Sequence, residues 1–251
     1  MKLPAKKFAA KKPTRKVLVS TLAPGLERLE RAIAHQGLAS RREAKALITN
    51  GSVKVNDKVI KEPGFGITVD TDVISIKGME AQAKESILLY KPRGLETSKT
   101  TPETKDIKDK YKQLAHLSPV GRLDKESEGL IILTNDGTLT KALTKEGSTV
   151  DKEYKVTVRE NVTDDALEKM TKGIMLDKIR TKPTTTKRVS RYTFTIVLNE
   201  GRKHQIRRMC AACRLTVESL TRIRIGHLQI QKMKAGTMKK LTEQDIALLK
   251  Q

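Results

Sequence analysis

The sequence of 251 residues contains no tryptophan, only three phenylalanines and four tyrosines, and only two cysteines. A domain that binds single strands mainly by stacking bases on aromatic side chains would need more aromatic residues. No apolar run reaches 18 residues, so no segment is long enough to span a bilayer. The leader lacks the apolar segment of a secretion signal, and we expect a cytoplasmic protein. A transit peptide is disfavoured because this leader has a single arginine and few serines.

The two cysteines, Cys210 and Cys213, are separated by two alanines. One CxxC pair is weak support for redox chemistry, and a zinc site would need two more ligands from four scattered histidines. The pair falls within a predicted helix, where residues three apart share one face. We therefore expect two buried apolar side chains and no metal site.

Positive charge is what the sequence has in excess. Its 51 Lys and Arg residues against 29 Asp and Glu residues leave a formal net charge of +22. Such a charge favours a polyanionic partner, either nucleic acid or an anionic membrane surface. Residues 1–26 carry seven of the basic residues and no acidic residue, with too little apolar surface to fold alone. We interpret them as a disordered basic arm that strengthens RNA binding without specificity.

Residues 27–80 have the pattern of a small unit with two helices and a hairpin. Apolar residues near helical spacing from Leu29 predict the first helix, and Ser40 with Glu43 fits the capping box of the second. The Asn56-Asp57 pair between valine-rich runs predicts a hairpin. Backbone N–H groups at the start of the second helix favour phosphate. The basic residues expected to bind RNA there are Arg41, Arg42 and Lys45.

Residues 81–251 contain more predicted strands than helices and show no regular β-α alternation. Strands are predicted at 130–133, 154–158, 192–198 and 220–225, and helices at 164–172, from about 205, and from about 243 to 249. We therefore expect an α+β fold. It comprises a small N-terminal helix-helix-hairpin RNA-binding domain (27–80) and a larger catalytic domain (81–251), whose mostly antiparallel mixed sheet is flanked by helices.

Asp124 lies in a polar, glycine-bounded loop directly before the apolar run at 130–133. A carboxylate on a loop between rigid elements is a frequent position for the reactive group of an enzyme. The same pattern also fits an ordinary turn, so this loop alone does not decide between the two.

Several motifs resemble known families. The stretches at 30–31, 37–44 and 51–56 resemble the small RNA-binding domain named after ribosomal small-subunit protein S-four. Later motifs resemble the signatures of RNA pseudouridine synthases: Gly-Arg-Leu-Asp at 121–124 with Glu-Gly-Leu at 128–130, Lys-Glu-Tyr at 152–154, and the basic stretch at 201–209. The stretch at 220–226 is similar to the branch that modifies ribosomal RNA and carries an S-four-type domain in front.

This resemblance implies isomerisation of uridine to pseudouridine in ribosomal RNA, with neither metal nor cofactor. The family's indispensable aspartate matches Asp124, which would act as a nucleophile on the sugar or the base, or would permit sugar deprotonation. Tyr154 would stack on the target base, with Ile206 packed beside it. Arg207 would be the bidentate partner of Asp124. Arg122 would help to hold the target nucleotide out of its helix.

Other basic residues of the third motif are expected to bind RNA, and they are Arg202, Lys203 and Arg208. His204 stands where this branch often has arginine. We expect a monomer with ribosomal RNA as partner, and leave open whether free RNA or an assembly intermediate is the substrate. The rival functions are an inactive RNA-binding or ribosome-assembly protein, and a redox or metal protein built on Cys210 and Cys213.

Overall fold

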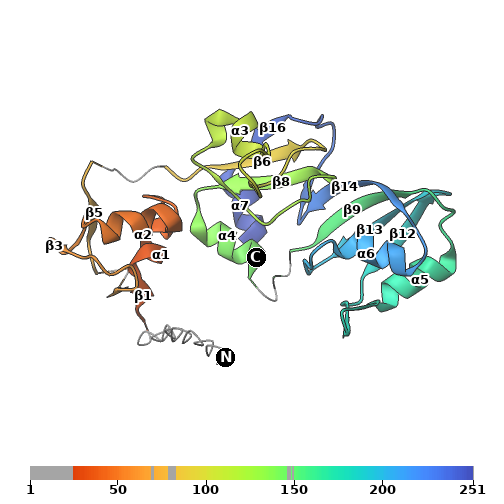
Figure 1. The fold of residues 1–251 in the computed structure, drawn as a ribbon, viewed down its shortest axis with the longest axis horizontal. Coiled ribbons are helices and arrows are strands. Elements are labelled where there is room, and N and C mark those ends of the chain that lie inside the picture. The colour runs from red at the N-terminus through yellow and green to blue at the C-terminus, as the bar shows by residue number, and fades with distance from the viewer. Residues whose placement is uncertain (1–24, 69–70, 79–82, 146–147, 149, 251) are drawn as a thin grey trace, which may run out of the picture.

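The computed structural model describes residues 25–68, 71–78, 83–145, 148 and 150–250. Most of the expected basic arm, residues 1–26, lies outside the described residues. Figure 1 shows three parts: a small N-terminal part, a central part that also contains the last helix and the C-terminus, and a third part, called here the C-terminal lobe, built around the segment from about residue 152 to residue 217. Among the helices in the described ranges, none is long and apolar enough to cross a membrane.

The fold is α+β, as predicted. The helices are α1 (Leu29–His35), α2 (Arg41–Thr49), α3 (Ile107–Lys110), α4 (Gly137–Thr144), α5 (Asp164–Lys172), α6 (Gln205–Ala212) and α7 (Glu243–Lys250), with a 3₁₀ turn η1 (Lys112–Leu114). The short strands of the N-terminal part are β1 (Glu27–Arg28), β2 (Val53–Val55), β3 (Lys58–Val59), β4 (Gly66–Ile67) and β5 (Ile74–Ile76). The remaining strands are β6 (Ser86–Lys91), β7 (Ser118–Pro119), β8 (Glu128–Thr134), β9 (Lys152–Val158), β10 (Met175–Leu176), β11 (Ile179–Arg180), β12 (Thr185–Ser190), β13 (Thr193–Leu198), β14 (Val217–Ile225), β15 (Leu228–Gln229) and β16 (Met238–Lys240).

The N-terminal part has its own core beneath α1 and α2. The predicted capping box forms, because the Ser40 N–H donates to the Glu43 carboxylate at 2.9 Å and the Glu43 N–H donates to Ser40 Oγ at 3.3 Å. Asn56 and Asp57 have φ values of +48° and +64°, as a two-residue hairpin turn requires. The local sequence therefore specifies this unit almost completely.

The large sheet has the strand order β12-β13-β9-β14-β8-β6-β16, and its pairings are antiparallel except for β14 with β8. This mixed, mostly antiparallel sheet confirms the predicted fold class. In the central part, α3 and η1 cover one face of β6 and β8, and α4 with α7 covers the other. In the C-terminal lobe, α5 and α6 pack on β9 and β13 (Figure 1).

The N-terminal part packs against α4. A Cβ atom added to Gly137 would lie 2.6 Å from His35 Cδ2 and 3.4 Å from the Ala34 carbonyl oxygen. A larger residue at this position would therefore require the His35 side chain to move.

Two exposed strands, β12 and β16, were absent from the sequence prediction. All residues of β16 and most of those of β12 are exposed, so neither strand shows the apolar alternation that reveals a half-buried strand. Both lie at the edges of the sheet, where pairing with a single neighbour forms the strand.

The buried N-cap of α4 gives a stability test. Asp136 accepts hydrogen bonds from the Thr138 N–H at 2.9 Å and from Lys250 Nζ at 3.0 Å. Burial alone would raise the pKa of Asp136, but these donors outweigh it and lower the pKa to about 2. Asp136→Ala should lower the free energy of unfolding by about 1–3 kcal/mol at pH 7, measured by urea denaturation.

Because the folded state lowers the pKa of Asp136, this stabilisation is present above about pH 4 and is lost as the pH falls towards 2. The difference in free energy of unfolding between the wild-type protein and Asp136→Ala should therefore become smaller over that pH range. Asp165→Ala removes an exposed partner of Lys169 and should cost much less, because solvent screens that ion pair. Equal losses in both variants would contradict the role of the buried cap.

Candidate active site

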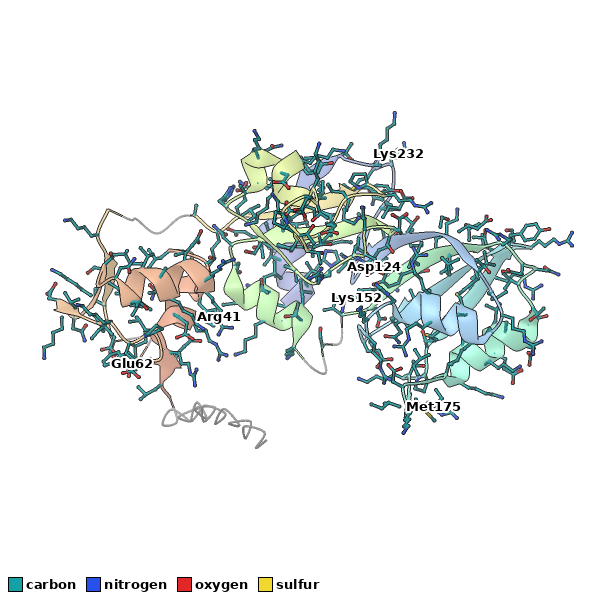
Figure 2. All side chains as sticks on the ribbon, in the orientation of Figure 1. Arg41, Glu62, Asp124, Lys152, Met175 and Lys232 are labelled. Atoms are coloured by element: carbon teal, nitrogen blue, oxygen red, sulfur yellow. The ribbon has the colours of Figure 1, made fainter. Side chains whose placement is uncertain are left out.

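A cavity of about 750 Å³ lies where the central part meets the C-terminal lobe. Its walls come from the loop before β8, the end of α4, the start of β9, the turn before α6, and β14. Figure 2 shows Asp124 and Lys152 at this junction. The volume is that of a site for a small molecule or a single extruded nucleotide.

Asp124 is held in the cavity wall by the residue before it. The Leu123 N–H donates to Thr97 Oγ1 at 3.0 Å, and the Thr97 hydroxyl donates back to the Leu123 carbonyl at 2.7 Å. Both residues are buried. The next side chain, Asp124, is 38% exposed, so its carboxylate is anchored yet open to a ligand.

Among the described residues, the basic side chain nearest to the Asp124 carboxylate is an imidazole. His204 Nε2 lies 3.6 Å from Asp124 Oδ1, a pair that is ionic when the imidazole is protonated. His204 has a φ of +52° at the N-cap of α6, the left-handed conformation. This turn directs its ring across the cavity, although the sequence identified His204 only as a departure from the motif.

Arg207 does not pair with the Asp124 carboxylate in this structure. Its guanidinium Nη2 donates instead to the Glu126 carbonyl oxygen at 2.9 Å. Arg207 lies on α6 beyond the turn that carries His204, and it reaches the loop two residues past Asp124. The predicted bidentate contact is replaced by a contact that braces the same loop.

Tyr154 and Ile206 form the apolar walls. Tyr154 projects from β9, is half-buried, and packs against the cores of both the central part and the C-terminal lobe. Ile206 projects from the first turn of α6 and is 4% exposed. Both side chains line the same cavity as Asp124.

Lys91 is a fully buried cation beside this site that the sequence did not reveal. Its Nζ donates to the Leu95 carbonyl at 2.7 Å and to the Pro92 carbonyl at 3.0 Å. Burial lowers the pKa of Lys91 to about 8, against the opposing attraction of Asp124 and two nearby glutamates. In the sequence, Lys91 had only the appearance of a polar residue at the end of a strand.

The predicted RNA-binding residues divide into three groups. Arg122, Arg202 and Lys203 line the cavity. Arg208 lies outside it and pairs with Asp177 at 2.6 Å. The remaining three lie exposed at the start of α2 in the N-terminal part, namely Arg41, Arg42 and Lys45.

Comparison with known proteins identifies the family. Residues 85–212 match the model of the RNA pseudouridylate synthase family, and residues 27–74 match that of the S4 domain. The chain belongs to the RNA pseudouridine synthase family. The match to the synthase model includes the Asp124 loop, Tyr154 and the whole of α6.

Relatives resemble the synthase over most of its length. It is 34% identical to ribosomal large subunit pseudouridine synthase B of Bacillus subtilis, over 90% of this chain and 96% of the relative. It is 33% identical to the dual-specificity RNA pseudouridine synthase RluF of Escherichia coli K12, over 87% of this chain and 77% of the relative. A crystal structure of a pseudouridylate synthase superposes with a TM-score of 0.66 at 28% identity, covering 88% of this chain and 99% of that one.

Of the two cysteines of the synthase, Cys210 lies on α6 and Cys213 directly follows it, and neither lines the cavity. Cys210 is fully buried, whereas Cys213 follows the end of the helix and is only partly buried. Burial raises the pKa of Cys210 to about 12, so its reactive thiolate is strongly disfavoured at neutral pH. This geometry argues against the redox alternative.

The loop of Asp124 enters β8 through a close backbone contact. Gly129 has a φ of +107°, and a Cβ atom there would lie 2.3 Å from the Arg222 carbonyl oxygen on β14. Gly129→Ala should therefore lower the free energy of unfolding by about 2–5 kcal/mol, because it adds backbone strain and a backbone overlap.

Gly121→Ala is the matched control. Gly121 also has a positive φ, +73°, but no described atom lies within 4 Å of its added Cβ. Gly121→Ala should therefore lower the free energy of unfolding by only about 1–2 kcal/mol, from backbone strain alone. Urea denaturation of both variants measures the difference, and a cost at Gly129 no larger than that at Gly121 would rule out the proposed overlap.

Proposed function

We propose that this synthase isomerises a specific uridine of ribosomal RNA to pseudouridine, with Asp124 as the reactive group and without a cofactor. The observation that carries the proposal is that Asp124, Tyr154 and Ile206, which come from three separate motifs, line one cavity. The Bacillus subtilis relative, a ribosomal large subunit pseudouridine synthase, supports ribosomal RNA as the substrate.

The reaction needs no external atom or electron. The bond from uracil N1 to ribose C1′ breaks, the base turns in place, and C5 bonds to C1′ while the C5 proton is lost and N1 gains a proton. Asp124 acts either as a nucleophile on the sugar or the base or as the group that permits sugar deprotonation. Tyr154 stacks on the base during the turn, and Ile206 limits its movement.

The cations around the cavity have separate tasks in this proposal. His204 and Lys91 stabilise the negative charge of Asp124, the former from 3.6 Å. Arg207 holds the loop through the Glu126 carbonyl. Arg122, which lines the cavity two residues before Asp124, holds the nucleotide in its extruded position.

We further propose that residues 27–80 dock the RNA and that residues 81–251 carry out catalysis. In the view of Figure 2, Arg41 lies between the helices of the small domain and α4. Its exposed side chain lies 3.7 Å from the buried carboxylate of Glu30, so the guanidinium is held in place while its outer side stays open to a phosphate.

Replacing the carboxylate tests the catalytic assignment. Asp124→Asn should reduce pseudouridine formation by roughly 1,000-fold or more, because an amide of equal size is neither a comparable nucleophile nor a base. Pseudouridine is mapped across ribosomal RNA from three strains: the wild type, a strain in which the gene is deleted, and the deletion strain carrying the Asp124→Asn gene.

One uridine should remain unmodified in the deletion strain and in the variant strain, and should be modified again when the wild-type gene is restored. RNA binding by the purified variant should be unchanged. If no site disappears on deletion, or if Asp124→Asn restores it, the proposal fails. Free transcripts and assembly intermediates, compared as substrates for purified protein, identify which form is modified.

The charge of the small domain gives a second test. Combined replacement of Arg41, Arg42 and Lys45 by Gln should weaken binding to ribosomal RNA and reduce the salt slope of log K by about 2–3, because each phosphate contact releases counterions. Lys169→Gln with Lys172→Gln, on the exposed face of α5, is the control for lost charge. Equal effects of the two sets would show that the small domain does not dock the RNA.

A further inference from the structure

Two cations on the floor of the cavity have no carboxylate partner among the described residues. Lys152 begins β9, and Arg222 lies on the neighbouring strand β14, where its Cα pairs with that of Tyr154. Residues two apart on a strand, and residues directly opposite on antiparallel strands, point to the same face. Lys152, Tyr154 and Arg222 therefore share the cavity face, and all three line the cavity.

Arg222 is buried, and part of its hydrogen-bonding capacity is unused. The residue is 4% exposed, and its Nε donates to the Leu130 carbonyl at 2.6 Å. Its Nη2 is buried without a hydrogen-bond partner in the described structure. A guanidinium is always charged, so removing it from water carries a cost that one carbonyl does not offset.

Lys152 adds a second charge beside it. Burial lowers the pKa of Lys152, repulsion from Arg222 lowers it further, and Asp151 opposes both effects. Over the described residues, no carboxylate lies within 4.0 Å of either cation. By contrast, the adjacent Arg224 pairs with Glu153 at 2.8 Å.

A third polar group lies in the same cavity wall. Ser127 is 1% exposed, and its hydroxyl has no hydrogen-bond partner among the described atoms. It follows Asp124 by three residues on the loop that leads into β8. Buried polar groups in native proteins are normally hydrogen-bonded, so an unused donor in a cavity wall calls for a partner, and a bound ligand can supply one.

We propose that Lys152 and Arg222 form a subsite for one phosphodiester group of the RNA, next to the nucleotide whose base stacks on Tyr154. A phosphodiester supplies the single negative charge that two adjacent cations lack, whereas a uracil carbonyl would leave both charges uncompensated. The inference rests on the proposed function for the identity of the stacked base. The subsite fixes the nucleotide from its backbone while Asp124 acts at the sugar or the base.

Phosphate ethylation interference tests the subsite even when the target uridine has not been identified. Unmodified ribosomal RNA transcripts are fragmented and ethylated sparsely, so that most fragments carry a single neutral phosphotriester. They are bound to full-length protein carrying Asp124→Asn, with and without Lys152→Gln. For the protein that carries Asp124→Asn alone, ethylation of one phosphate beside a uridine should weaken binding roughly tenfold or more. In the double variant, ethylation at that phosphate should have no further effect.

Lys155→Gln is the matched control. Lys155 loses the same charge from the same strand, but it is exposed and points to the opposite face from Tyr154. This variant should keep the full interference pattern. Lys152→Gln should also lower the salt slope of binding by about 0.7–0.9, the value for one phosphate contact.

Arg222→Lys separates charge from the structural contact with Leu130. It keeps a cation at the site, so the interference at this phosphate should persist even where the thermal stability falls. The inference is overturned if Lys152→Gln and Lys155→Gln give the same interference pattern, or if Arg222→Lys, when folded, loses the signal. Pseudouridine mapping distinguishes the two proposals. If Lys152→Gln removes the interference at a phosphate beside a uridine that the protein does not modify, the subsite is supported and only the proposed function is refuted.

Discussion

The short parallel pairing between β8 and β14 joins the two halves of the large sheet. It comprises only two residue pairs, Thr221 with Glu128 and Arg222 with Gly129. The second pair is so close that only glycine fits, since an added Cβ would lie 2.3 Å from the Arg222 carbonyl oxygen. Because the strands separate beyond this point, the cavity opens there, and the loop that carries Asp124 lies at its edge.

The electrostatics of the cavity follow from this junction. Arg222 bridges the separating strands through the Leu130 carbonyl and also places a charge against the ligand space. Lys91 lies near enough to Asp124 for the two charges to attract, and Lys152 lines the cavity together with Tyr154. The carboxylate thus meets a fixed positive environment, while the remaining positive charge is available to the RNA backbone. The proposed subsite of Lys152 and Arg222 is the part of this positive charge that lies inside the cavity.

Local signals in the sequence were reliable where they had a local physical cause. Helix α5 has the predicted bounds, with Thr163 as its N-cap and Gly173 just beyond its end. The Ser40 and Glu43 capping box and the Asn56-Asp57 turn formed as expected. The prediction failed for the exposed edge strands β12 and β16, which form by pairing and carry no apolar pattern of their own. It also failed to find Lys91, since burial of a polar residue depends on distant segments.

The sequence by itself determined the α+β class, the small N-terminal unit and the motifs that contain Asp124, Tyr154 and Ile206. The class and the N-terminal unit depend on capping, turn chemistry and apolar periodicity, which act between neighbours along the chain. The motifs were identified by their resemblance to a known family. Only the tertiary structure decided which charges meet. It placed His204 beside Asp124, turned Arg207 to the Glu126 carbonyl, and set Lys152 beside Arg222 on the cavity face. Such contacts join segments far apart in sequence, so their distances depend on how the strands pair.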